Sequence, residues 1–114
     1  MRKQIIQNAA HQVATQLRCV EDSIDAALAQ IAQLQADMIE ASQAAHTAPG
    51  AAQDAFVEVA TALQGLVAAR GGVANAHGAL KDASTTIPVV REMGFGDVVE
   101  CPPPEGAQTL RVVA

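Results

Sequence analysis

Residues 6–45, IQNAAHQVATQLRCVEDSIDAALAQIAQLQADMIEASQAA, decide the fold of this chain. Apolar residues recur there in alternating steps of four and three, and the stretch contains no Gly and no Pro. A sustained series of this kind is typical of a long helix that packs along its whole length against other helices. The series comprises Ile6, Ala10, Val13, Leu17, Val20, Ile24, Ala27, Ile31, Leu34, Met38, Ala41 and Ala45. We therefore expect one helix over about residues 3–46.

A second helix is expected over about residues 50–83, after the break at His46-Thr47-Ala48-Pro49-Gly50. Proline is tolerated in the first turn of a helix, and Thr47, or alternatively Ala48, would be the cap. A connection this short folds the second helix back antiparallel along the first. The pair Gly71-Gly72 lowers helix propensity by roughly 1 kcal/mol per glycine, so a kink there stays an open alternative.

The second helix carries a bulky stripe beside a nearly bare one. The bulky stripe contains Phe56, Val59, Leu63, Leu66, Val73 and Leu80, and its spacing passes through Arg70 and His77. The bare stripe consists of Ala62, Gly65, Ala69, Gly72, Ala76, Ala79 and Ala83. A stripe without large side chains lets another helix approach closely.

The fold class predicted from these patterns is all-α, a long antiparallel helical hairpin. Two helices alone leave much of their apolar stripes exposed, and stripes of this length mark an interface. A homodimer with twofold symmetry would cover them and give a four-helix bundle. The residues expected in that interface are Val13, Leu17, Val20, Ile24, Ile31, Leu34, Met38, Gly65, Ala69, Gly72 and Ala76.

Residues 87–114 are expected to form a non-helical, extended tail that belongs to the same domain as the hairpin at 1–86. The helix should end before Pro88, because the residue before a proline disfavours helical geometry. Residues 98–99 and 110–113 have β-capable sequences, so a small β-hairpin, an extended chain packed on the bundle and a mobile tail stay open. We favour docking on the bundle, with Phe95 as the anchor and residues 102–106 as the most mobile stretch.

Composition excludes several classes of protein. The chain has 114 residues, enough for one domain, and a net charge of −5, which disfavours binding to nucleic acid. No apolar run approaches the ~20 residues needed to cross a bilayer, so we expect no membrane association, and the N-terminus does not resemble a secretory signal. Cys19 and Cys101 lie far apart without a CxxC pattern, which predicts two free thiols in a cytoplasmic protein.

The sequence contains few candidates for chemistry. It lacks the spacings of a zinc site, a phosphate-binding loop or a nucleophile with its base, so we predict no catalytic, cofactor or metal site. Arg70 and His77 lie one heptad apart and have two interpretations. They could bind an anion in a groove between helices, or they could be long polar side chains at the edge of the stripe, which we favour. The carboxylates of Glu21, Asp22 and Asp25 are interpreted as a solvated acidic face.

These observations favour a non-enzymatic structural or protein-interaction role, as an adaptor or scaffold that acts through a helical bundle. The expected partner is a second copy of the chain, with an unidentified protein partner as a further option. The alternative is a small-molecule or anion-binding protein, or a small helical enzyme, with its groove near Arg70 and His77. No family is recognised from the motifs.

Overall fold

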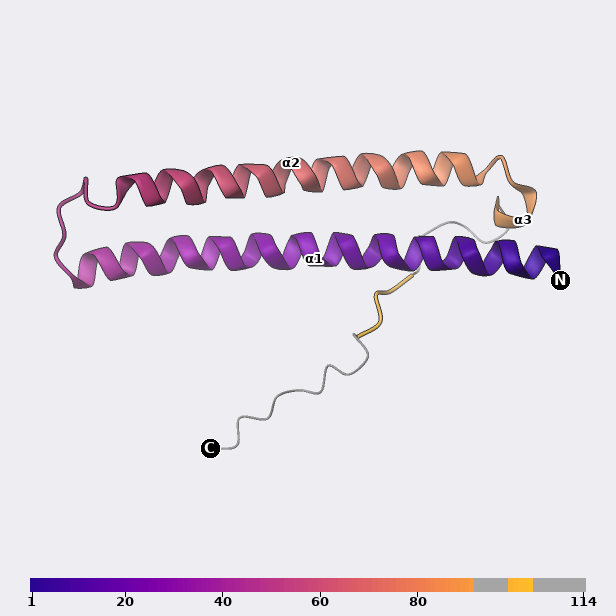
Figure 1. The fold of residues 1–114 in the computed structure, drawn as a ribbon, viewed down its shortest axis with the longest axis horizontal. Helices are drawn as coiled ribbons and strands as arrows, with labels where there is room; N and C mark the ends of the chain where they lie inside the picture. The colour runs from indigo at the N-terminus through magenta and orange to yellow at the C-terminus, as the bar shows by residue number, and fades with distance from the viewer. Residues whose placement is uncertain (92–98, 104–114) are drawn as a thin grey trace, which may run out of the picture.

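The computed structural model describes residues 1–91 and 99–103, and two long helices dominate them. The elements are α1 (Arg2–Ala44), α2 (Gln53–Ser84) and the single turn α3 (Pro88–Arg91). Figure 1 shows α1 and α2 lying side by side and antiparallel, with α3 at the end of the hairpin where the N-terminus lies. At ~1.5 Å per residue, α1 is about 65 Å long. The predicted all-helical hairpin is confirmed, and the described residues contain no strand.

The turn between the helices ends later in the sequence than predicted. The second helix begins at Gln53, after Pro49, so neither Thr47 nor Ala48 is its cap. The hydroxyl of Thr47 instead donates a hydrogen bond to the carbonyl of Ser42 at 3.2 Å. The same carbonyl also accepts a hydrogen bond from the backbone N–H of Thr47 at 3.2 Å, so Thr47 holds the end of α1 with two hydrogen bonds. His46 and Ala52 have left-handed backbone angles, with φ of 52° and 61°, which reverse the chain.

The second helix runs without a break through Gly71-Gly72, so the alternative of a kink there is wrong. It ends at Ser84, where three consecutive hydroxyls bond to carbonyls three residues earlier. Ser84, Thr85 and Thr86 donate these bonds at 2.6, 2.6 and 2.7 Å. The last turn therefore has its carbonyls satisfied before Pro88, where the prediction placed the stop.

The helices meet along what we call the hairpin seam, a series in alternating steps of three and four. In α1, the seam consists of the less exposed residues Gln7, Ala10, Ala14, Leu17, Glu21, Ile24, Leu28, Ile31, Gln35, Met38 and Ser42. In α2, it follows Phe56, Val59, Leu63, Leu66, Arg70, Val73, His77, Leu80 and Ser84.

The hairpin seam takes up only half of the series that the sequence predicted for the first helix. Leu17, Ile24 and Ile31 belong to both, whereas Val13 and Val20 lie outside the seam and are exposed. The sequence predicted packing against other helices along the whole series; in the single chain, part of the series packs against α2 and the rest stays exposed. The physical reason is that one neighbouring helix covers only one stripe of its partner, and the second half of the series faces away from that stripe.

The chain beyond α2 returns to α1 and is fastened to it. In α3, Val90 is only 4% exposed, and the side-chain amide of Gln7 donates a hydrogen bond to the carbonyl of Val89 at 3.0 Å. Cys101 forms a disulfide with Cys19 of α1, with an S–S distance of 2.02 Å. The prediction of two free thiols is therefore wrong. The described parts of the tail dock on the chain's own helices, as we favoured. The prediction of a non-helical tail is wrong for Pro88–Arg91, which form α3, because a proline is tolerated in the first turn of a helix.

The other expectations for the tail fall largely outside the described residues. The described residues do not include Phe95, residue 98, residues 110–113 or most of the stretch 102–106. Val99 is described and is not part of a strand.

The disulfide generates a stability prediction. Replacing Cys101 with Ser should lower the free energy of unfolding by about 2–4 kcal/mol, because the bond closes a long loop in the unfolded chain. Denaturant unfolding of the oxidised protein, the reduced protein and the variant would measure this. The reduced protein and the variant should share one midpoint below that of the oxidised protein. Three equal midpoints would contradict the prediction.

Candidate functional site

The hairpin has two broad sides, each bordered by one row of residues from each helix. Within the seam, steps of three and four residues alternate. The preceding row contains the residue directly before each three-residue step, for example Val20 before the step from Glu21 to Ile24. The following row contains the residue directly after each such step, for example Asp25. Both helices are right-handed and run in opposite directions, so the two preceding rows share one side of the hairpin and the two following rows share the other. The two sides differ sharply in chemistry.

The side formed by the preceding rows, called the apolar face below, carries no polar residue. On α1 it comprises Ile6, Val13, Val20, Ala27, Leu34 and Ala41, and on α2 it comprises Ala55, Ala62, Ala69, Ala76 and Ala83. Val13 and Leu34 are each 47% exposed, and Val20 is 38% exposed. The face is therefore aliphatic over one helix and bare over the other.

The predicted interface residues divide between the hairpin and this face. Leu17, Ile24, Ile31 and Met38 pack within the hairpin seam, whereas Val13, Val20 and Leu34 lie on the apolar face. The small residues of α2, Gly65, Ala69, Gly72 and Ala76, are all exposed in the single chain. A Cβ atom added at Gly65 or Gly72 would meet no atom within 4 Å. Among the described residues, no helix packs closely against these glycines.

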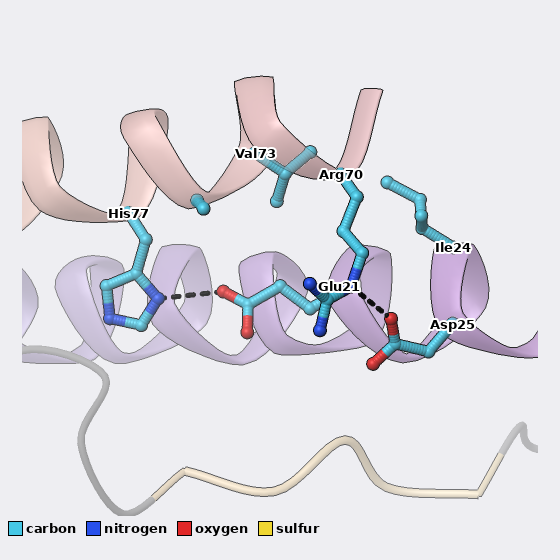
Figure 2. A pocket seen from close by; sticks show the side chains of 7 residues that line it. Glu21, Ile24, Asp25, Arg70, Val73 and His77 are labelled. Atoms are coloured by element: carbon cyan, nitrogen blue, oxygen red, sulfur yellow. Dashed lines mark hydrogen bonds and ion pairs between the residues drawn. The ribbon is translucent and has the colours of Figure 1, made fainter. Parts of the chain in front are cut away.

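The opposite side, called the mixed face below, holds the polar candidates. Its rows comprise His11, Arg18, Asp25, Ala32 and Ile39 on α1, and Ala60, Val67, Ala74 and Lys81 on α2. A groove of about 230 Å³ opens there between the helices. Its lining residues are Glu21, Ile24, Asp25, Arg70, Val73, Ala74 and His77. Figure 2 shows Arg70 and His77 reaching from α2 toward the carboxylates of α1.

Both sequence-predicted groove residues are paired with carboxylates of α1. Arg70 Nε donates to Asp25 Oδ1 at 2.7 Å, and both side chains are more than half exposed. This hydrogen bond and the charge of Asp25 raise the pKa of Arg70 above its ordinary value, so the guanidinium stays charged. His77 Nδ1 lies 2.7 Å from Glu21 Oε1, with side chains that are 28% and 25% exposed. This second pair sits inside the hairpin seam.

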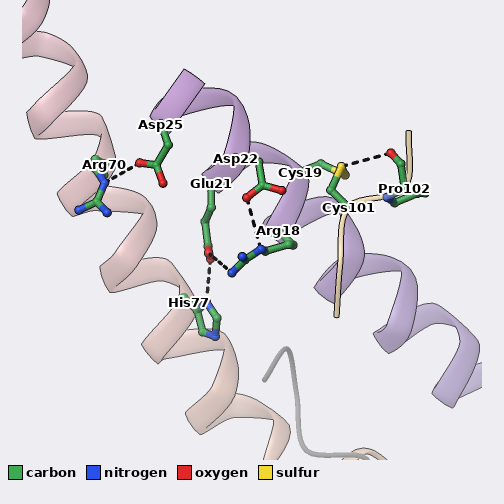
Figure 3. A network of polar contacts seen from close by, with 9 residues as sticks. All are labelled: Arg18, Cys19, Glu21, Asp22, Asp25, Arg70, His77, Cys101 and Pro102. Carbon is green, nitrogen blue, oxygen red and sulfur yellow. Dashed lines mark hydrogen bonds and ion pairs between the residues drawn. A yellow bond between two sulfur atoms is a disulfide. The ribbon is translucent and has the colours of Figure 1, made fainter. Parts of the chain in front are cut away.

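The interpretation of the carboxylates as a solvated acidic face is wrong for Glu21, which is half-buried. It holds for Asp22, which remains exposed and pairs with Arg18 of the same helix at 3.3 Å. Arg18 also lies 3.9 Å from Glu21, so Figure 3 shows one network from His77 through Glu21 and Arg18 to Asp22. Sequence reasoning missed the partners of Arg70 and His77. The available signal was the pair of carboxylates four residues apart on the helix expected to run antiparallel.

The pairing limits what the groove can do chemically. Arg70 and His77 each already have a carboxylate partner, so an added anion must compete with Asp25 or Glu21. Within residues 1–91 and 99–103, no three His, Cys, Asp or Glu side chains are grouped so that they could hold a metal ion. Over the same residues, neither long helix is apolar enough along its length to cross a membrane.

The polar pair within the hairpin seam generates a second prediction. Replacing Glu21 and His77 together with Leu should raise the free energy of unfolding by about 1–2 kcal/mol, because packed aliphatic side chains often stabilise more than a partly buried polar pair. Thermal unfolding would measure the shift. Replacing Arg18 and Asp22 together with Leu is the matched control, and it should leave the midpoint unchanged because that pair is exposed and lies outside the seam. A lower midpoint for the Glu21–His77 variant would contradict this view of the pair.

Comparison of the chain with protein-family models, with curated proteins and with solved structures gave no match. The proposals that follow rest on the apolar face, the groove and the disulfide.

Proposed function

We propose that this protein is a non-enzymatic interaction protein that acts through self-association of its hairpin into a four-helix bundle. The observation that supports the proposal is how little of the hairpin is buried in the single chain. Among the described residues, Ala14 and Val90 are the hydrophobic side chains that are buried, at 3% and 4% exposure. Neither is large enough to provide a core for a rod about 65 Å long.

The apolar face gives self-association an energetic reason. Complete burial of a Val or Leu side chain contributes ~1.5–3 kcal/mol, and Val13, Val20 and Leu34 retain between a third and a half of their exposure. The face contains no charge, so burying it leaves no ion unpaired. An adaptor or scaffold role follows in this proposal, because a bundle leaves the polar outer surfaces of four helices available to other proteins. The identity of a further protein partner stays open.

The oligomeric state tests the proposal directly. Light scattering at micromolar concentration should give twice the chain mass of 11.7 kDa. Leu34→Asp should shift the protein toward the single-chain mass, because it would place a charge in the buried face. Ile39→Asp is the matched control, since Ile39 is 51% exposed on the mixed face and should tolerate the charge. A single-chain mass for the unaltered protein would overturn the proposal.

The groove supports a second candidate function, a small-molecule or anion-binding protein. Its supporting observation is the cavity of about 230 Å³ beside Arg70 and His77, in the place where the sequence suggested a ligand. The paired carboxylates make it the weaker candidate, because Arg70 and His77 already have partners. Titration calorimetry with sulfate and with succinate at low ionic strength would test it. Binding that Arg70→Leu abolishes would favour this candidate, and absence of heat would reject it for these anions.

A cytoplasmic location stays a prediction, but one of the expectations that supported it is wrong. It was inferred partly from two free thiols, whereas Cys19 and Cys101 form a disulfide. Structural disulfides are typical of oxidising compartments. The disulfide therefore favours an oxidising environment.

A further inference from the structure

The apolar face has a shape that selects how two copies can stack. Over α1 it is a row of four large aliphatic side chains, Ile6, Val13, Val20 and Leu34, with alanines at 27 and 41, and over α2 it is a row of five alanines bordered by Gly65 and Gly72. The side chains of the α1 half therefore project farther from the face than those of the α2 half. We infer that, in the proposed dimer, α1 of each copy lies over α2 of the other, with aliphatic side chains seated on alanines. This inference rests on the proposed self-association.

Two arrangements with twofold symmetry bring the apolar faces together. If the axis runs perpendicular to the helices, α1 lies over α1 of the second copy and α2 over α2. Large side chains then meet large ones at one edge, and alanines meet alanines at the other. The distance between the facing helices would therefore have to differ between the two edges. If the axis runs parallel to the helices, every contact places the aliphatic row on the alanine row. Both edges then have the same spacing, which close packing of two regular hairpins favours.

Symmetry also fixes the register of the second arrangement. A twofold axis parallel to the helices leaves each residue at its own height along the rod. Glu21 and His77 lie opposite each other across the hairpin, 2.7 Å apart at their polar atoms. Because the helices run in opposite directions, the residues directly before them, Val20 and Ala76, lie within about 3 Å of each other along the rod. Val20 of one copy should thus contact Ala76 of the second copy.

The same register extends along the rod in both directions. Two heptads farther from the Glu21–His77 pair, it places Leu34 over Ala62 of the second copy. Leu34 is 47% exposed in the single chain, and a leucine over an alanine lets one side chain fill the space that the other leaves. This pair also lies far from Cys19, so a cysteine introduced there would not be adjacent to the native disulfide.

The arrangement is tested by linking two singly substituted chains. Leu34→Cys and Ala62→Cys are prepared separately with the native disulfide intact, mixed, warmed to exchange subunits and oxidised. A non-reducing gel should show a covalent dimer in the mixture and none in either variant alone. Ala32→Cys mixed with Val67→Cys is the matched control on the mixed face, and it should give no covalent dimer. Light scattering of each variant establishes whether it self-associates.

Each other outcome overturns a specific statement. A covalent dimer from Leu34→Cys alone would show α1 over α1 and reject the arrangement. A dimer by light scattering without covalent product in the mixture would also reject the arrangement, while the proposed self-association would stand. Covalent product from the control pair would assign the interface to the mixed face. A single-chain mass for the unaltered protein would reject both the arrangement and the proposed function.

Discussion

Packing of α1 against α2 along one heptad seam is the constraint on which the rest of this structure depends. The seam decides which residues of each helix remain outside, because a helix offers a single neighbour only one stripe. It leaves the aliphatic row with Val13 and Leu34 on the same side as the alanine row of α2. It also brings Glu21 to His77 and Asp25 to Arg70. The apolar face and the groove are therefore two consequences of the same choice of stripe.

The polar pair inside the seam helps to define the register of the hairpin. Sliding α2 by one heptad would bring Glu21 opposite Arg70, but it would set His77 opposite Ala14, away from any carboxylate of the seam. A half-buried polar side chain without a partner is costly, so the slipped hairpin is less stable than the observed one. Polar pairs within helical seams are known to specify register at some cost in stability. We suggest that the Glu21–His77 pair has this role here.

Much of the fold could be predicted from the sequence, because it depends on local patterns. The apolar period and the absence of Gly and Pro before His46 predicted the first helix, and Pro88 predicted the end of the second. The choice of seam could not be predicted in this way. Leu28 and Leu34 are equally apolar, yet only Leu28 faces α2, and this choice depends on what the second helix places opposite.

The candidate site was less predictable than the fold, because it depends on contacts between distant residues. The position of Arg70 and His77 on the bulky stripe was visible in the sequence, and both indeed lie beside a groove. Their carboxylate partners require the register of the two helices, 45 and 56 residues apart in the chain. The disulfide joins residues separated by 82 positions, and no spacing rule links cysteines so far apart.

The disulfide and the apolar face lie on different sides of α1, and this separation has a consequence for how the protein could be controlled. Cys19 points away from α2, and Figure 3 shows the fastened segment on that outer side of α1. Val13 and Val20 remain exposed with the segment in place, so the disulfide does not cover the proposed interface. Oxidation therefore stabilises the folded hairpin without blocking the apolar face. Any effect of reduction on self-association would act through the stability of the hairpin.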